Sequence, residues 1–270
     1  MGRIKFKWAL RNHEAFTYLA AAPKSSFMTF DVTIPVLDEE ATLQSQTAKL
    51  HAFLRKHYPD LQQWNILIAD NGSTDATPDL ARELEQEYPN VHLVKVPRRG
   101  VGLALKTSWG QSQADIVGYM DLDLATDLKH FPETYERLTQ GGCDLVYASR
   151  LHRDAKVINR PFKREVSSRG FNLILKWYLG VGFSDGMCGF KFLRRQHLDR
   201  LMEYGARNDG WFFSTELLTV AEWLDLNICE LPVTWTDDAG SSKVKILPLA
   251  KRYLRSMRDL KRFGKAQGML

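Results

Sequence analysis

The chain has 270 residues, 44% of them hydrophobic and 26% charged, and a formal net charge of +5. This length and composition suit one large α/β domain, or two small ones, with a substantial core. Three cysteines are too few and too odd in number for a disulfide framework, and their spacing matches no zinc site. The composition therefore excludes a small disulfide-rich module, and the cysteines are expected to be reduced, as in the cytoplasm.

Hydropathy along the chain predicts neither a membrane span nor a secretory signal. The basic first residues are followed by no clean apolar segment. The best apolar candidate, residues 171–183, contains one lysine and two glycines and is shorter than the roughly 18 residues that a spanning helix needs. We therefore expect a cytoplasmic protein, either soluble or peripheral on the cytosolic face of a membrane.

Apolar runs of two kinds alternate between residues 30 and 149. Short β-branched runs predict strands over residues 30–35, 64–70, 91–96, 116–120 and 144–149. Amphipathic runs predict helices over residues 39–58, 103–112 and 131–139, and a further helix that begins near Thr77. This alternation with short connections predicts an α/β fold with a mostly parallel central sheet flanked by helices.

The second half of the chain has a looser pattern. A polar, basic stretch covers residues 152–169, and helices are predicted over residues 168–179 and 246–263. No linker divides the chain into two domains. We therefore expect an N-terminal extension over residues 1–28, one α/β domain over residues 29–245, and a basic amphipathic helix and tail over residues 246–270.

Three of the predicted strands end in acidic and small polar residues. The first leads into residues 34–40 (Ile-Pro-Val-Leu-Asp-Glu-Glu), the second into residues 68–75 (Ile-Ala-Asp-Asn-Gly-Ser-Thr-Asp), and the fourth into Asp121-Leu122-Asp123. The carboxyl ends of parallel strands meet at one edge of a sheet, which opens onto a ligand crevice. A polar turn explains any one cluster well, but the three in this order predict a nucleotide site.

Asp121 and Asp123 stand two residues apart at a strand end. Alternation along a strand places such residues on one face. Paired carboxylate oxygen atoms suit a hard divalent cation that holds a diphosphate. The pair therefore predicts an anchor for a metal ion and for the diphosphate of a nucleotide.

These motifs resemble those of the family 2 glycosyltransferases, which are inverting, use nucleotide sugars and have the GT-A fold, with a Rossmann-like nucleotide-binding sheet. The family opens with Pro-x-x-Asn-Glu-Glu, and residues 35–40 read Pro-Val-Leu-Asp-Glu-Glu. The second family motif, Asp-Asp-Gly-Ser-x-Asp, is present as Asp-Asn-Gly-Ser-Thr-Asp at residues 70–75. The third, Asp-x-Asp, is intact at residues 121–123.

Motifs in the second half narrow the resemblance to the dolichyl-phosphate β-glucosyltransferases and the polyprenyl-phosphate mannosyltransferases. The motifs in question are Ser149-Arg150, residues 185–191 (Asp-Gly-Met-Cys-Gly-Phe-Lys), residues 211–216 (Trp-Phe-Phe-Ser-Thr-Glu) and residues 230–235 (Glu-Leu-Pro-Val-Thr-Trp). Ala125-Thr126, after the acidic pair, is closer to the glucosyl branch. Residues 185–189 depart from the common Asp-Thr-Gln-Cys-Gly, which leaves the acceptor open.

The resemblance implies an inverting, metal-dependent transfer of a hexose from a nucleotide sugar to a polyprenyl- or dolichyl-phosphate acceptor. UDP-glucose is the favoured donor and GDP-mannose is the alternative. Asp123, assisted by Asp121, would hold Mg²⁺ or Mn²⁺. The donor-binding residues would be Pro35, Leu37, Glu39, Asp70, Asn71, Asp121, Leu122, Asp123, Arg150 and Arg164.

Whether the reaction needs a general base depends on the acceptor. A lipid monophosphate is already ionised near neutral pH, whereas a hydroxyl must lose its proton to a carboxylate. Asp185 is the first candidate for this catalytic base and Glu216 the second, and a structural role beside an arginine fits each equally well. A soluble glycosyltransferase whose acceptor is a phosphorylated metabolite or a natural product is therefore the alternative function.

The excess positive charge lies near the C-terminus, where residues 243–265 contain nine Lys or Arg and one acid. The helix predicted there also has a narrow apolar stripe, formed by Leu247, Leu249, Leu254 and Met257. This pattern fits a helix lying on an anionic membrane, and it fits a surface helix packed on the domain. Because the charge is confined to this tail and no nucleic-acid-binding module is visible, nucleic acid is not an expected partner.

Overall fold

The structure is a computed structural model that describes residues 27–237 and 246–270. The extension expected over residues 1–28 therefore lies almost entirely outside the described residues. Within the described residues, no helix is both long and apolar enough to cross a membrane.

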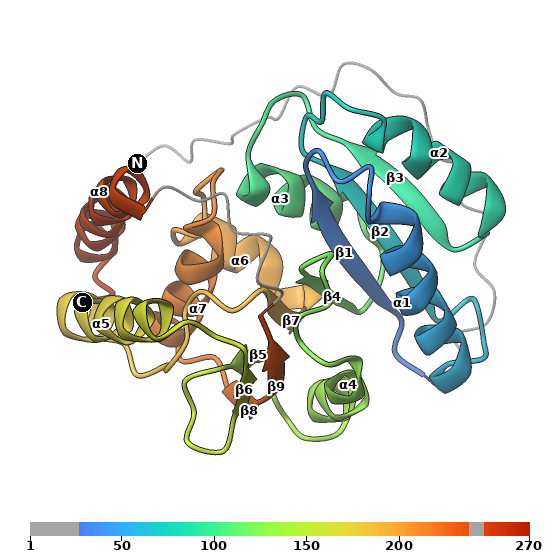
Figure 1. Cartoon of the computed structure of the whole chain (residues 1–270). Helices are drawn as coiled ribbons and strands as arrows, with labels where there is room; N and C mark the ends of the chain where they lie inside the picture. Colours follow the sequence, from blue (N-terminus) through green and yellow to red (C-terminus); the bar gives the residue numbers. More distant parts are fainter. Residues whose placement is uncertain (1–26, 238–245) are drawn as a thin grey trace, which may run out of the picture.

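A seven-stranded sheet forms the centre of the molecule (Figure 1). Its strands lie in the order β3-β2-β1-β4-β7-β5-β8, and all are parallel except β7, which runs antiparallel to β4 and β5. The strand bounds are β1 Phe30–Val36, β2 Trp64–Asp70, β3 Val91–Lys95, β4 Ile116–Met120, β5 Leu145–Ser149, β7 Phe190–Arg194 and β8 Ile228–Pro232. A small parallel sheet pairs β6 (Lys156–Ile158) with β9 (Thr234–Thr236).

Helices cover both faces of the sheet and create two large apolar cores, beside a small third cluster of Leu67, Ala69, Val94 and Ala104. The helices of the first core are α1 Leu43–His57, α2 Thr77–Glu87 and α4 Phe131–Thr139. The helices of the second core are α3 Val101–Gln111, α5 Phe162–Leu179, α6 Leu198–Glu203, α7 Phe213–Trp223 and α8 Ile246–Ala266. Short 3₁₀ turns over Leu128–His130 and Arg195–His197 lead into α4 and α6.

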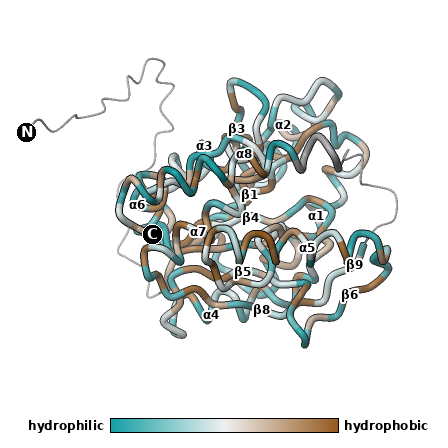
Figure 2. Tube along the Cα trace, turned by 90° about the vertical axis from the view of Figure 1, so that its left-hand side faces the viewer, coloured by the Kyte–Doolittle hydropathy of each residue, from teal (hydrophilic) through white to brown (hydrophobic). Residues whose placement is uncertain are grey.

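Strand β4 contributes to both cores. Ile116 and Met120 belong to the first core, whereas Val117 and Tyr119 belong to the second. Successive side chains of a strand point to opposite faces, and every residue of β4 is buried because both faces are covered. The central strands are therefore mostly apolar. Figure 2 places β1 and β4 near the middle of the molecule.

The α/β fold predicted from the sequence is confirmed. The strands at residues 64–70 and 116–120 and the helix at residues 131–139 have the predicted bounds. Helix α1 begins at Leu43 rather than at residue 39, because the chain forms a loop and a turn after β1. After residue 150 the predicted helix starts earlier, at Phe162, and several short elements were not predicted at all.

Two of the three cysteines form a disulfide, so the expectation of reduced cysteines is wrong for this pair. Cys143 and Cys229 are 86 residues apart in the sequence, and their Cα atoms lie 5.9 Å apart. Cys143 lies just before β5 and Cys229 lies in β8, and these strands are parallel neighbours. Sheet order, which the spacing of cysteines does not reveal, brings them together. Because disulfides are rare in the cytoplasm, the cysteines do not support a cytoplasmic location.

We predict that N-ethylmaleimide modifies one cysteine, Cys188, when the unfolded but unreduced protein is alkylated. Reduction should open the loop that the disulfide closes and lower the free energy of unfolding by about 2–4 kcal/mol. Intact mass spectrometry and urea unfolding, with and without a reductant, measure these two quantities. Modification of three cysteines before reduction would contradict the pairing.

Candidate active site

Three strand ends meet at one edge of the sheet, as the sequence predicts. Strands β2, β1 and β4 are parallel neighbours, so the loops that follow them leave the sheet on the same side. These loops contain the acidic clusters at residues 37–40, 71–76 and 121–126. The topology therefore brings motifs that are far apart in the sequence to one edge of the sheet.

Hydrogen bonds join the loop after β1 to the loop after β2. The Asp38 backbone N–H donates to Ser73 Oγ at 3.0 Å, and the Asp38 carboxylate accepts from the Thr74 backbone N–H at 2.8 Å. The Glu40 carboxylate accepts from the Ala76 backbone N–H at 3.0 Å. Asp38 has a φ of 54°, which Asn and Asp tolerate better than other residues. Asp38 thus meets the same backbone requirement as the Asn of the family motif.

Asp70 and Asn71 hold these loops in place. Both side chains are buried. The Asp70 carboxylate accepts from the Ser73 backbone N–H at 3.0 Å, and Asn71 Oδ1 accepts from the Gly100 backbone N–H at the start of α3. Asp70 and Asn71 therefore fix the conformation of the loop after β2 and its contact with the start of α3.

Pro35, Leu37 and Glu39 lie at the end of β1 and are half-buried. The Glu39 backbone N–H donates to Thr77 Oγ1 at 2.8 Å, and the Glu39 carboxylate accepts from Thr42 Oγ1 at 3.0 Å. Pro35, Leu37 and Glu39 each keep some surface exposed, whereas Asp70 and Asn71 are buried. Of these five predicted donor-binding residues, the first three are therefore the ones that a ligand would reach.

A small pocket at the end of β4 contains the acidic pair. Its lining residues are Met120, Asp121, Asp123, Leu124, Ala125, Thr126, Gly189 and Trp235. The Leu122 side chain is buried in the first core, so its backbone is the part nearest to a ligand. The Asp121 backbone N–H donates to the Gly189 carbonyl at 3.0 Å. A Cβ atom at residue 189 would collide with the Asp121 carboxylate, so this position requires glycine.

The two acids have different surroundings. Burial, followed by the nearby charge of Asp123, raises the pKa of Asp121 to about 7. Asp123 is exposed, and its carboxylate accepts from the Ala125 backbone N–H at 3.0 Å. No group of three or more His, Cys, Asp or Glu side chains in the described part of the chain is placed to hold a metal ion. The pair fits Mg²⁺ or Mn²⁺ only if a ligand supplies further oxygen atoms, as a diphosphate does.

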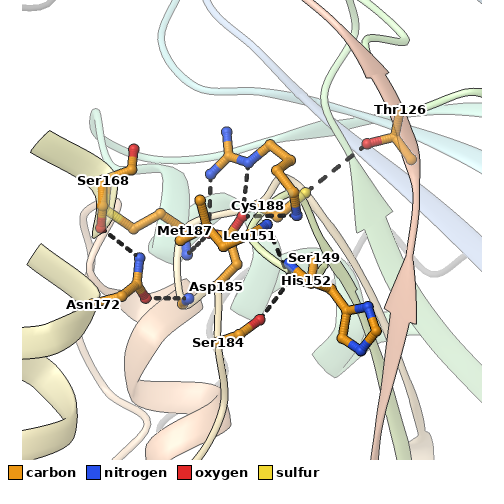
Figure 3. A network of polar contacts seen from close by, with 12 residues as sticks. Thr126, Ser149, Leu151, His152, Ser168, Asn172, Ser184, Asp185, Met187 and Cys188 are labelled. Atoms are coloured by element: carbon orange, nitrogen blue, oxygen red, sulfur yellow. Dashed lines mark hydrogen bonds and ion pairs between the residues drawn. The ribbon is translucent and has the colours of Figure 1, made fainter. Parts of the chain in front are cut away.

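Arg150 and Asp185 form a buried ion pair near this pocket. Arg150 Nε and Nη2 donate to the two Asp185 carboxylate oxygen atoms at 2.8 and 3.0 Å. Burial alone would raise the pKa of Asp185, but the charge and the hydrogen bonds of Arg150 outweigh burial and lower this pKa to about 2. Figure 3 shows Asp185 within a wider polar network that includes Ser149, Asn172 and Cys188.

Trp235 brings three guanidinium groups together. The guanidinium carbon atoms of Arg150, Arg160 and Arg164 lie 5.3, 5.8 and 6.0 Å from the centre of its ring. Trp235 also lines the pocket of the acidic pair and forms an isolated β-bridge with Thr126. The structure therefore places a cluster of positive charge, here called the arginine cluster, beside the acidic pair.

Arg160 and Arg164 each pair with a carboxylate, and Arg160 Nη2 also donates to Ser168 Oγ at 2.5 Å. Arg164 Nη1 donates to Asp237 at 2.6 Å, and the Arg164 side chain is 40% exposed. Arg160 Nη1 donates to Glu165 at 2.8 Å, but the buried Arg160 Nε has no hydrogen-bond partner among the described residues. A buried N–H group of a charged side chain that has no hydrogen-bond acceptor favours the binding of an anion. Sequence reasoning missed Arg160, because nothing distinguishes it within the basic stretch.

The two acids considered as a base do not line the pocket in the described part of the chain. Asp185 is fully buried and is engaged by Arg150. Glu216, in α7, accepts from the backbone N–H groups of Arg207 and Asn208 at 2.8 and 2.6 Å, and burial raises its pKa to about 7. We therefore interpret both carboxylates as positioning groups, one for an arginine and one for a loop.

A fully buried lysine beneath the site was also missed. Lys191 Nζ, in β7, donates to the Cys188 carbonyl at 2.6 Å and to Ser214 Oγ at 2.7 Å. Tyr119 Oη donates to the same Ser214 oxygen at 2.7 Å. These bonds tie the loop that contains Gly189 to α7. Buried lysines are rare, and the sequence contains no signal that separates this lysine from a surface one.

The central sheet and the acidic motifs at its strand ends define an α/β protein of the GT-A type. Residues 31–202, more than half of the chain, match the family described as Glycosyl transferase family 2. The chain therefore belongs to family 2 and is a glycosyltransferase, as the resemblance of its motifs predicts.

Similar proteins with assigned names are glycosyltransferases. Glycosyltransferase AglD of Haloferax volcanii is 30% identical over 228 residues, which cover 84% of this chain and 36% of that protein. The dolichyl-phosphate beta-glucosyltransferase of Dictyostelium discoideum is 30% identical over 220 residues, covering 78% of this chain and 67% of that protein. The polyprenol monophosphomannose synthase of Mycolicibacterium smegmatis is 30% identical over 222 residues, covering 79% and 80%. The chain thus spans about a third of the Haloferax protein's length.

A solved structure with the same fold is glucosyl-3-phosphoglycerate synthase from Mycobacterium tuberculosis in complex with Mn²⁺, UDP and glucosyl-3-phosphoglycerate. It aligns with a TM-score of 0.61 and 20% sequence identity, over 86% of this chain and 80% of that one. At this identity the likeness concerns the fold, and it confirms the GT-A architecture.

We predict that Asp121→Asn stabilises the metal-free protein at alkaline pH. The pKa of Asp121 rises from 3.8 to about 7 on folding, so the folded state loses stability as the pH rises through this interval. In EDTA at about pH 8 the variant should gain roughly 1–2 kcal/mol, because a pKa unit corresponds to about 1.4 kcal/mol and partial exposure reduces the full effect. The gain should vanish near about pH 4.

Urea unfolding at both pH values measures the effect, with Asp123→Asn as the control. Because Asp123 is exposed, its replacement should change stability less. An Asp121→Asn variant that is no more stable than wild type at alkaline pH would contradict the environment described for this acid.

Proposed function

We propose that the chain transfers a hexose, with inversion, from a nucleotide sugar to the phosphate of a polyprenyl- or dolichyl-phosphate acceptor. UDP-glucose is the favoured donor. The observation that carries the proposal is the arginine cluster around Trp235 beside the acidic pair. A second anion site next to the diphosphate site suits an acceptor that is itself a phosphate. The Dictyostelium and Mycolicibacterium relatives, whose names include a dolichyl phosphate and a polyprenol monophosphate sugar, support this acceptor class.

The donor would lie across the ends of β2, β1 and β4. The loops at residues 37–40 and 71–76 would receive the base and the ribose. The diphosphate would lie at Asp121 and Asp123, which would hold Mg²⁺ or Mn²⁺. When bound, such a cation offsets the charge that develops on the leaving nucleoside diphosphate.

The acceptor phosphate would lie at the arginine cluster, with Arg160 and Arg164 as its main hydrogen-bond donors. Guanidinium groups match the geometry of phosphate oxygen atoms. Arg150 is held by Asp185 and would add its charge from a fixed position. This assignment refines the expectation from the sequence, in which Arg150 and Arg164 bind the donor's phosphates.

Such an acceptor removes the need for a general base. A phosphate monoester oxygen is ionised near neutral pH, and it would form a bond to the anomeric carbon as the bond from that carbon to the donor's diphosphate breaks. Attack from the face opposite the leaving group inverts the configuration. The residues of the chain would then act by orienting two anionic groups and by stabilising the developing charge. The engaged carboxylates of Asp185 and Glu216 are consistent with this chemistry.

The proposal is tested by transfer of radiolabel from UDP-glucose or GDP-mannose to polyprenyl phosphate, with 3-phosphoglycerate as a water-soluble comparison acceptor. We expect label in the organic phase with UDP-glucose and polyprenyl phosphate, and its loss in EDTA. Label in 3-phosphoglycerate alone would favour the alternative, a soluble transferase for a phosphorylated metabolite. The arginine cluster would serve that acceptor's phosphate as well.

Asp123→Ala should lower transfer about a hundredfold or more, because it removes a group that stabilises developing charge. The free energy of unfolding should stay near that of wild type, since Asp123 is exposed. Asp154→Ala is the matched control, because Asp154 is an exposed acid in another loop. Full transfer by the Asp123→Ala variant would reject the metal assignment.

Arg160→Met should raise the KM for polyprenyl phosphate about 10–100-fold, because hydrogen bonds to charged groups contribute about 1.5–3 kcal/mol. The KM for the nucleotide sugar should change little. Arg153→Met is the control, since that side chain is 89% exposed. An equal increase in both KM values would show that Arg160 does not belong to the acceptor site.

A further inference from the structure

Helix α5 exposes a row of large apolar side chains. Phe162, Val166, Leu173 and Trp177 are 80%, 53%, 68% and 84% exposed. Their spacing of four, seven and four residues places them on one side of an α-helix. Gly170 lies between them in the sequence, and the space beside it is open. Large apolar side chains gathered on one exposed side of a helix in this way mark an interaction site.

Among the described side chains of the neighbouring helix, α8, Leu254 is a large apolar residue that is exposed, at 54%. The α8 side chains Tyr253, Met257 and Leu260 are buried in the second core, and the Tyr253 ring packs 5.4 Å from that of Phe171 in α5. Lys261 Nζ donates to the Tyr178 carbonyl of α5. Of the apolar stripe predicted for the C-terminal helix, Met257 is buried in the domain and Leu254 is exposed, whereas Leu247 and Leu249 lie outside the described side chains. Figures 1 and 2 both show α8 lying alongside α5.

The two helices that meet here, α5 and α8, contain a large excess of basic residues. Helices α5 and α8 together contain eleven Lys or Arg residues and two acids, Glu165 and Asp259. Glu165 is neutralised by ion pairs with Arg160 and Arg169. The exposed basic side chains are Lys163, Arg169, Lys176, Lys251, Arg252, Arg255, Arg258, Arg262 and Lys265. A partner for this face must therefore bury apolar side chains and at the same time supply negative charge.

The row begins at the arginine cluster. Arg160 and Arg164 flank Phe162, the first residue of the row, and both lie at Trp235. From Phe162 to Trp177 the helix rises by roughly 22 Å at 1.5 Å per residue. A helix lying flat on a bilayer buries side chains of this kind at the boundary between headgroups and acyl chains. In that orientation the lipid's phosphate would be close to the arginines while its chain stays in the membrane.

We propose that the outer face of α5, flanked by the basic side chains of α8, docks on an anionic lipid bilayer. The face positions the arginine cluster at the membrane surface. A second copy of the chain is the less suitable occupant, because a two-fold contact would bring the same basic side chains against one another. This inference rests on the proposed function, because a lipid acceptor is the reason for the enzyme to dock on a bilayer. Binding to vesicles can nevertheless be measured without any substrate.

Co-sedimentation of the full chain with vesicles of phosphatidylcholine, with and without phosphatidylserine, tests the proposal. We expect binding to the anionic vesicles that weakens at high salt, since ionic strength screens exposed charges. Trp177→Ser and Leu173→Ser should each lower the vesicle affinity about tenfold or more, as expected for the loss of a buried apolar side chain. Trp211→Ser is the matched control, because Trp211 is 50% exposed but lies outside α5, and it should bind like wild type.

Arg252→Gln combined with Arg255→Gln should weaken binding to anionic vesicles about tenfold or more, since each basic residue near the surface contributes about 1 kcal/mol. Binding of the Trp177→Ser variant equal to that of wild type would overturn the proposal. So would a wild-type chain that does not sediment with anionic vesicles. A dimer in vesicle-free solution that Trp177→Ser converts to a monomer would assign the face to a second copy and would also overturn it.

Activity with a short-chain, water-soluble prenyl phosphate separates this inference from the proposed function. Wild type and Trp177→Ser should transfer sugar to that acceptor at equal rates, because neither needs a membrane to reach it. Loss of vesicle binding with retained transfer supports the docking face. Absence of transfer by both proteins would count against the proposed function. The result of the vesicle-binding experiment would still decide whether the outer face of α5 docks on a bilayer.

Discussion

The Asp121 carboxylate lies directly against the backbone of residue 189, and only glycine leaves room for it. Strand β7 runs antiparallel between β4 and β5. The loop before β7 therefore lies at the end of β4, where residue 189 contacts Asp121. Buried Lys191 then fixes this loop to Ser214 at the start of α7. The acidic pair, the β7 loop and α7 therefore form one structural unit, and the position of the proposed metal site depends on all three.

A second unit begins at the buried pair of Arg150 and Asp185. Removal of one partner from such a pair typically costs about 3–5 kcal/mol, because a charge is left buried without compensation. The pair holds Arg150 at Trp235, where Arg160 and Arg164 also lie. Helix α5 starts at these residues and continues as the exposed apolar row. One short segment thus connects the proposed phosphate site to the proposed membrane face.

The sequence was sufficient for the first half of the fold and for the residues at its strand ends. Regular alternation of strands and helices and their short connections predict the parallel sheet, and parallel strands bring their carboxyl ends together. The second half lacks these signals. Helix α7 is buried along residues 213–221, including its polar residues Ser214, Thr215, Glu216 and Thr219. Strand β7 is short and antiparallel, and the Cys143–Cys229 disulfide follows from sheet order. Arg160 and Lys191 are important because of burial, which local sequence does not encode.

In the proposed function, the end of β4 anchors the donor's diphosphate through a divalent cation that Asp121 and Asp123 would hold. The most direct measurement is a crystal structure with UDP and Mn²⁺, recorded near the manganese absorption edge. We expect an anomalous peak about 2–2.5 Å from a carboxylate oxygen of Asp123, with the diphosphate bound to the same ion and the base between the loops after β1 and β2. UDP bound without manganese at this pair, or manganese bound elsewhere, would contradict this assignment.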